Sequence, residues 1–192
     1  MASTDDLPTI GFDDAAHFGM WLREHHRSAP GLWLKIPKKG KGGTGPTYGE
    51  ALEEALRFGW IDSQKATCDE CYFVQRFTPR RSRSKWSKIN RKKAEELIAS
   101  GHMEQAGQVE VDRAKEDGRW ATAYDSPSTA TVPPDFQKAL DARPNASAFF
   151  ESLTSAKRFS ILFRIHDAKR ADTRKRRIET FADMCARGES PT

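Results

Sequence analysis

Residues 59–79 read GWIDSQKATCDECYFVQRFTP, and this stretch decides the fold of the chain. Trp60–Lys65 and Cys71–Thr78 have the composition of strands, and the polar residues Cys68–Glu70 between them are typical of a short turn. Two strands joined in this way pair antiparallel. Upstream, Leu32, Leu34 and Ile36 alternate with Trp33 and Lys35, as in a third strand. The sequence therefore predicts a small, mainly antiparallel sheet of three strands.

Helices are predicted on both sides of this hairpin. A first helix should begin near Asp13, whose carboxylate can cap open backbone N–H groups, and it should bury Phe18 and Leu22. Thr47-Tyr48-Gly49-Glu50 matches a capping box at the start of a second helix. Asn90 is expected to cap a third helix, and a fourth should run from about Met103 to Asp117.

The remaining sequence predicts a linker and then helices only. Residues 121–134 contain Ser-Pro-Ser-Thr and end in Pro133-Pro134, which is typical of a linker. Beyond it, Pro134 suits the first position of a helix and Thr154 suits an N-cap. We therefore expect an α+β domain over residues 10–120, a linker over 121–134, and an all-helical C-terminal domain over 135–188.

Composition limits the class of protein. The chain has 192 residues, of which 31% are charged, and its formal net charge is +5. No stretch approaches the roughly 20 apolar residues that a membrane span requires, so we expect no membrane partner. Met1–Pro8 carries two Asp and no apolar core, so we expect no signal peptide and a cytoplasmic location.

The cysteines do not predict a metal or redox centre. Cys68 and Cys71 form one C-x-x-C pair, which is half of a four-ligand zinc site, and Cys185 is distant. Asp69 and Glu70 between them would raise a thiol pKa rather than lower it. We expect free thiols, no metal and no cofactor.

The most unusual segment is a basic block that begins in the second strand of the hairpin. From Arg76 to Lys93 there are nine Lys or Arg and no Asp or Glu. Guanidinium groups bind phosphate through paired donors, serine hydroxyls add hydrogen bonds, and an exposed Trp86 would stack on a base. The block predicts a phosphate-bearing ligand or nucleic acid; the alternative is a solvated loop that keeps the protein soluble. The candidate binding residues in it are Arg76, Arg80, Arg81, Arg83, Ser84, Trp86, Ser87 and Asn90.

A second candidate lies on the hairpin itself. Alternation places Trp60, Asp62 and Gln64 on one face of their strand. If Ile61 packs inward, Asp62 faces outward and could pair with Arg76 or Arg80. Asp62 would then be either a general base or an ion-pair partner that orients the arginines. No catalytic residue can be assigned from spacing alone.

The last helix carries a third candidate. Arg174 and Arg177 are three residues apart and share a helical face. This face is either solvated or forms a basic cleft together with the Arg80 block.

Several of these motifs resemble those of one family. Gly59-Trp60-Ile61-Asp62-Ser63-Gln64, Phe77-Thr78-Pro79-Arg80-Arg81, Ser84-Lys85-Trp86-Ser87-Lys88-Ile89-Asn90, Gly118-Arg119-Trp120 and the run from Ala168 to Ile178 are similar to the YdeI/OmpD-associated, bacteriocin-protection-like proteins. The resemblance spans roughly residues 10–188. It implies a role in stress tolerance or bacteriocin resistance, with no settled reaction and no catalytic residues.

We therefore expect a cytoplasmic stress-protection protein that binds a phosphate-bearing ligand or nucleic acid. Two alternatives remain open. One is an enzyme that acts on an anionic small molecule, with Asp62, Ser63 or Ser84 doing the chemistry. The other is a protein-interaction module whose basic face docks an acidic partner.

Overall fold

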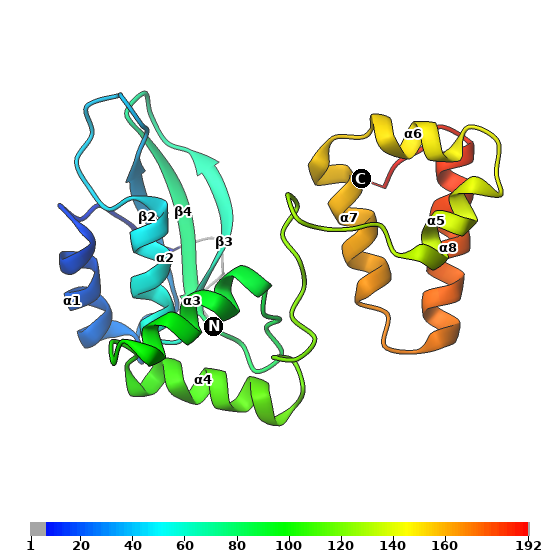
Figure 1. Ribbon diagram of the computed structural model, residues 1–192. Coiled ribbons are helices and arrows are strands. Elements are labelled where there is room, and N and C mark those ends of the chain that lie inside the picture. Colours follow the sequence, from blue (N-terminus) through cyan, green and yellow to red (C-terminus); the bar gives the residue numbers. More distant parts are fainter. Residues whose placement is uncertain (1–6, 192) are drawn as a thin grey trace. The chain divides into compact units, whose positions relative to one another are not determined.

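The computed structural model describes residues 7–191, and these residues form an α+β fold of two compact units (Figure 1). The first unit comprises the residues up to Trp86 together with Asn90–Ala123, and the second comprises Ser87–Ile89 and the residues from Tyr124 onward. Most of Met1–Pro8, where we expect no signal peptide, lies outside the described residues.

The sheet of the first unit has four strands in the order β1-β2-β4-β3. They are β1 (Thr9–Ile10), β2 (Leu32–Pro37), β3 (Trp60–Thr67) and β4 (Tyr72–Pro79). The predicted hairpin β3–β4 and the strand β2 are confirmed, and both of their pairings are antiparallel. The prediction of three strands is wrong, because β1 pairs parallel to β2 through Thr9 and Trp33. A strand of two residues is too short to show an alternating pattern in sequence.

Helices α1 (Ala15–His25) and α2 (Tyr48–Arg57) contribute buried residues to the core of the first unit. Phe18 and Leu22 of α1 lie in one buried cluster with the alternate residues Leu32, Leu34 and Ile36 of β2. The capping box of α2 is confirmed: the Thr47 side chain accepts from the Glu50 amide, and the Glu50 side chain accepts from the Thr47 amide. The cap of α1 is Asp14 rather than Asp13, since its carboxylate accepts from the His17 amide at 2.9 Å.

Two further helices follow the hairpin, α3 (Lys88–Ala99) and α4 (Gln105–Glu116). Asn90 does not cap α3, because the helix begins two residues earlier; its side chain lies in the first turn and is buried. Gly59 has φ +73°, and a Cβ atom there would lie 2.8 Å from the Ala106 carbonyl oxygen of α4. Glycine is thus required where the turn into β3 meets α4.

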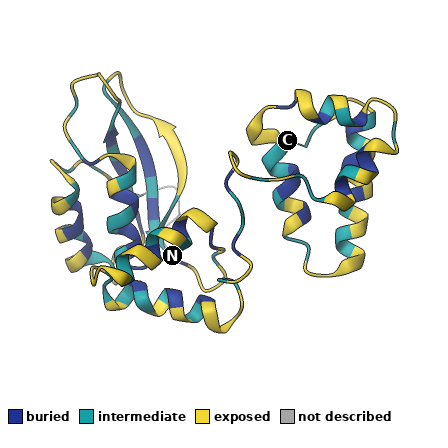
Figure 2. Cartoon of the chain, viewed as in Figure 1, coloured by how far each residue is buried: buried dark blue, intermediate teal, exposed yellow. Residues whose placement is uncertain are grey.

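The second unit is helical from Pro134 onward. Its helices are α5 (Pro134–Asp141), α6 (Ala146–Ser152), α7 (Ser155–His166) and α8 (Ala171–Ala186). Pro134 begins α5 and Thr154 caps α7, as the sequence predicts. The unit has its own buried cluster, which includes Phe136, Phe150 and Phe181 (Figure 2).

An ion-pair clamp joins α8 to the end of α5. The Arg143 guanidinium donates to Glu179 at 2.5 Å, to Asp183 at 2.6 Å, and to the Ala139 carbonyl oxygen at 2.8 Å. These carboxylates raise the Arg143 pKa, with the hydrogen bond to Asp183 as the largest cause.

Among residues 7–191, no helix has the length and apolar character needed to cross a membrane. In the same range, no group of three or more His, Cys, Asp or Glu is placed to hold a metal ion. Cys68, Cys71 and Cys185 are free thiols.

Candidate anion-binding loop

The segment Arg80–Ser87, here called the arginine loop, leaves the sheet at the end of β4. The Arg80 amide donates to the Gly59 carbonyl oxygen at 3.0 Å, which fixes the start of the loop. Arg81 and Ser84 then close a turn: the Ser84 amide donates to the Arg81 carbonyl oxygen at 2.9 Å, and the Arg81 amide donates to Ser84 Oγ at 3.0 Å. The hydroxyl of Ser84 therefore shapes the loop.

Trp86 anchors the far end of the loop in the core. It is 2% exposed and belongs to the buried cluster of the first unit. The Arg80 guanidinium lies 3.5 Å from the centroid of its ring, and Trp120 contacts it edge-on with centroids 4.9 Å apart. The prediction that Trp86 offers a stacking face to a base is wrong, because the ring is buried and is in contact with Arg80 and Trp120.

Two arginines hold the loop from beneath. Arg80 is 6% exposed and donates to the Lys85 carbonyl oxygen at 3.3 Å. Arg119, which precedes Trp120, donates to the Ser84 carbonyl oxygen at 2.6 Å and is paired with Asp117 at 2.7 Å. Burying a guanidinium costs several kcal/mol unless it is well paired. These arginines therefore act as supports, and Arg80 does not present its charge at the surface.

The charge that the loop does present comes from other side chains. Arg81, Ser82, Arg83 and Lys85 are exposed. Beneath them, the Trp86 indole N–H and Arg119 Nη2 are buried and have no hydrogen-bond partner among residues 7–191. The exposed part of the loop is thus positively charged, and two hydrogen-bond donors beneath it have no acceptor among the described residues.

The hairpin candidates lie elsewhere. Trp60 is 1% exposed and packs in the core, so the condition that Ile61 faces inward is not met. The Asp62 carboxylate accepts from the Tyr48 hydroxyl at 2.8 Å. A register shift between Asp62 and Lys65 breaks the simple alternation on which our prediction relied. On the neighbouring strand, Arg76 Nη1 donates to Gln64 Oε1 at 3.4 Å.

The remaining predicted residues are placed as follows. Ser87 is buried and forms an isolated bridge with Tyr124 in the second unit. Arg174 donates to Asp135 at 2.8 and 2.9 Å, and Arg177 donates to the Arg164 carbonyl oxygen. Both therefore tie α8 to other helices of its own unit.

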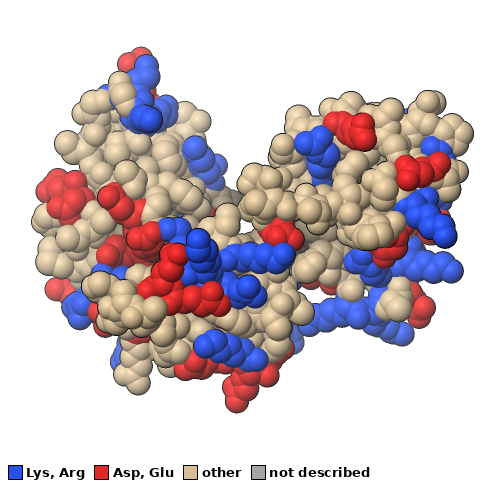
Figure 3. Space-filling view, viewed as in Figure 1, with Lys and Arg blue, Asp and Glu red and all other residues tan. Residues whose placement is uncertain are grey.

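The cleft predicted between Arg174, Arg177 and the Arg80 block would join residues of two units, and it stays a prediction. Within the second unit, basic side chains gather toward the end where α7 passes to α8, low in Figure 3. Exposed Arg164, Lys169 and Arg170 belong to this end.

Sequence reasoning missed two of the residues that contact the loop, Arg119 and Trp120. Arg119 and Trp120 are 35 and 34 residues away from their partners Ser84 and Trp86. The only signal in the sequence is the Gly118-Arg119-Trp120 motif, which places an arginine and an aromatic residue side by side after α4.

Two family models match this chain. The domain of unknown function DUF8412 matches residues 10–110, and the model described as bacteriocin-protection, YdeI or OmpD-associated matches residues 129–188. The second match contains the run from Ala168 to Ile178, whereas the motifs of residues 59–64 and 77–90 fall in the first. Searches of curated proteins and of solved structures find no match.

Proposed function

The chain belongs to the DUF8412 family, and its residues 129–188 match the bacteriocin-protection, YdeI or OmpD-associated model; on this basis we propose that it acts in stress protection by binding the phosphate backbone of nucleic acid through the exposed side chains of the arginine loop. The cytoplasmic location expected from the sequence belongs to the same proposal.

The observation that carries the proposal is the mounting of three exposed cations on a fixed turn. Arg81, Arg83 and Lys85 are exposed, while the carbonyl oxygens of Ser84 and Lys85 accept hydrogen bonds from the part-buried Arg119 and the buried Arg80, respectively. A loop that serves only solubility has no need of buried cationic supports. A turn whose backbone is already held by hydrogen bonds loses less backbone entropy when its cations contact a row of phosphates.

Nucleic acid fits this loop better than a single nucleotide. The three cations stand on an exposed turn, and an extended backbone can contact several of them at once. Trp86 is buried, so no base can stack on it. The contacts that remain are with phosphates, which carry no sequence information, and binding should therefore be insensitive to sequence.

The test is a salt titration of binding to duplex and single-stranded oligonucleotides. If each of the three cations neutralises one phosphate, the log–log slope should be about −2.7 on duplex DNA and about −2.1 on single strands. In the variant Arg81→Gln/Arg83→Gln/Lys85→Gln, binding should be lost, or its slope should approach zero.

A matched control separates the loop from general charge. Arg27→Gln/Lys39→Gln/Lys41→Gln removes the same number of positive charges from exposed positions of the first unit. This control should bind as the unchanged protein does. Equal losses in both variants would refute a role for the loop. Salt-tolerant binding of one nucleotide would favour the enzyme alternative, and no response to any nucleic acid would overturn the proposal.

A further inference from the structure

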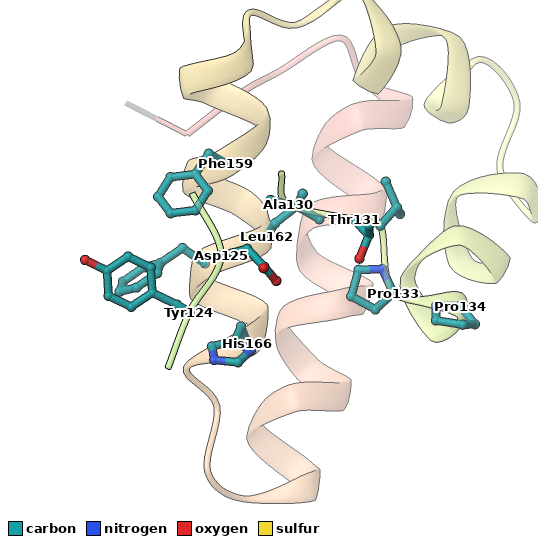
Figure 4. Close-up of a pocket in the computed structure, with 11 residues that line it drawn as sticks. Tyr124, Asp125, Ala130, Thr131, Pro133, Pro134, Phe159, Leu162 and His166 are labelled. Carbon is teal, nitrogen blue, oxygen red and sulfur yellow. The ribbon is translucent and has the colours of Figure 1, made fainter. Parts of the chain in front are cut away.

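The second unit contains a cavity that the proposed function does not use. It lies between α7 and the segment that leads into α5, and its volume is about 210 Å³ (Figure 4). All of its lining residues belong to the second unit: Tyr124, Asp125, Ala130, Thr131, Val132, Pro133, Pro134, Phe159, Leu162, Phe163 and His166.

The walls of this cavity suit a flat apolar ring. Tyr124 and Phe163 pack edge to face with centroids 4.9 Å apart, and Phe159 lies 5.8 Å from Phe163. Leu162 adds an aliphatic surface, and Pro133 lies across the opening from it in Figure 4. Aromatic side chains of this kind stabilise a planar guest through offset or edge-on contacts.

One side of the cavity is polar. Figure 4 shows the Asp125 carboxylate and the His166 ring at the same opening, with Thr131 on the other side. Asp125 Oδ1 is paired with Lys88 Nζ at 2.7 Å. The carboxylate therefore reaches the cavity with its charge balanced by a neighbour, while it still offers acceptor lone pairs.

The Lys88–Asp125 ion pair favours a bound molecule without net charge. A cation would have to compete with Lys88 for Asp125, and an anion would meet the carboxylate directly. A neutral molecule with an N–H donor faces neither penalty, and its donor can satisfy an Asp125 lone pair.

The volume sets the size of the guest. An apolar cavity of about 150 Å³ holds benzene, so about 210 Å³ corresponds to roughly eight or nine non-hydrogen atoms. That is the size of two small fused rings.

We propose that the second unit binds a neutral, planar, N–H-bearing aromatic molecule of one or two fused rings in this cavity, with the ring between Leu162 and Pro133 and the N–H donating to Asp125. This site is separate from the arginine loop. It makes no use of phosphate and does not depend on nucleic-acid binding.

The test is an NMR titration of the full-length protein, labelled with ¹⁵N, with three probes: indole, benzimidazole, and indene, which has the shape of indole but no N–H donor. Indole and benzimidazole should shift the amide signals of residues that line the cavity. Indene should bind about tenfold more weakly, because a hydrogen bond to a charged acceptor is lost.

Two variants that replace an alanine with phenylalanine test where indole binds. Ala130→Phe should fill the cavity and weaken indole binding at least tenfold, and Ala148→Phe makes the same change at an exposed position of α6. In both variants the amide signals of the second unit should stay dispersed and, away from the substituted residue, unchanged, which shows that this unit is folded. The proposal is overturned if indole and benzimidazole shift no cavity signals up to their solubility limits, if indene binds as well as indole, or if folded Ala130→Phe binds indole normally.

Discussion

Replacing Trp86 with alanine should remove most of the stability of the first unit. Truncating a buried aromatic residue to alanine costs about 3–5 kcal/mol. Trp86 is 2% exposed, and its ring also carries the Arg80 guanidinium at 3.5 Å. A desolvated cation–π contact adds about 2 kcal/mol. We therefore expect a loss of at least about 5 kcal/mol in the unfolding free energy of this unit, comparable to the whole stability of many domains.

The chain carries its own reporter for this measurement. All five tryptophans belong to the first unit: Trp21, Trp33, Trp60, Trp86 and Trp120. Tryptophan fluorescence therefore follows the unfolding of this unit in urea, whereas helical circular dichroism also includes the second unit. A loss of about 5 kcal/mol should lower the fluorescence midpoint by about 2 M urea or more.

A milder variant guards against complete unfolding. Trp86→Phe keeps a ring beneath Arg80 and leaves a cavity of roughly 40 Å³, which costs about 1 kcal/mol. If Trp86→Ala lost less than about 1 kcal/mol, or if the two variants were equally stable, Trp86 would not anchor the arginine loop.

Three other predictions follow from the structure. In urea unfolding, Gly59→Ala should destabilise the first unit by at least about 1 kcal/mol more than Gly118→Ala. Both residues have positive φ, but only at Gly59 would an added Cβ atom clash with a backbone atom. Equal losses of stability would contradict this prediction. The hydrogen bond from Arg174 lowers the pKa of Asp135 below its ordinary 3.8, so its stabilising effect is present above about pH 4 and is lost as the pH falls through the lowered value. An acid titration of helical circular dichroism should accordingly be shallower for Asp135→Asn, and an unchanged titration would show that the pair is irrelevant. Burial raises the pKa of the Cys185 thiol, so a thiol reagent should modify the other two cysteines first and Cys185 only on unfolding, whereas simultaneous modification of all three would refute its burial.

Local patterns were the part of the fold that sequence could predict. The capping box at Thr47, the hairpin around Cys68–Glu70 and the start of α5 at Pro134 each depend on residues within one or two turns of chain, and all three are present. β1 was missed because it is two residues long. Asn90 was misplaced because a good cap residue also fits the first turn of a helix that starts earlier.

The site was harder to predict because it depends on contacts between distant residues. A tryptophan within a run of arginines and serines has the composition of a binding surface, and composition alone cannot show that Trp120 and Arg80 enclose it. The cavity of the second unit gave even less signal. Its lining combines a linker with one face of α7, and a linker has no periodicity from which an inner face can be inferred.

The chain passes between its two units more than once, and this limits how the second unit can be produced as a separate fragment. It leaves the first unit after Trp86, returns at Asn90, and leaves again after Ala123. A fragment that begins at Tyr124 would therefore lack Lys88, the partner of Asp125. Such a fragment would hold every residue that lines the cavity, but it would leave the Asp125 carboxylate without its Lys88 partner. Transplanting it into another protein together with this ion pair would require a short graft of Ser87–Ile89, so the two compact units are interleaved along the chain although the two family matches follow one another.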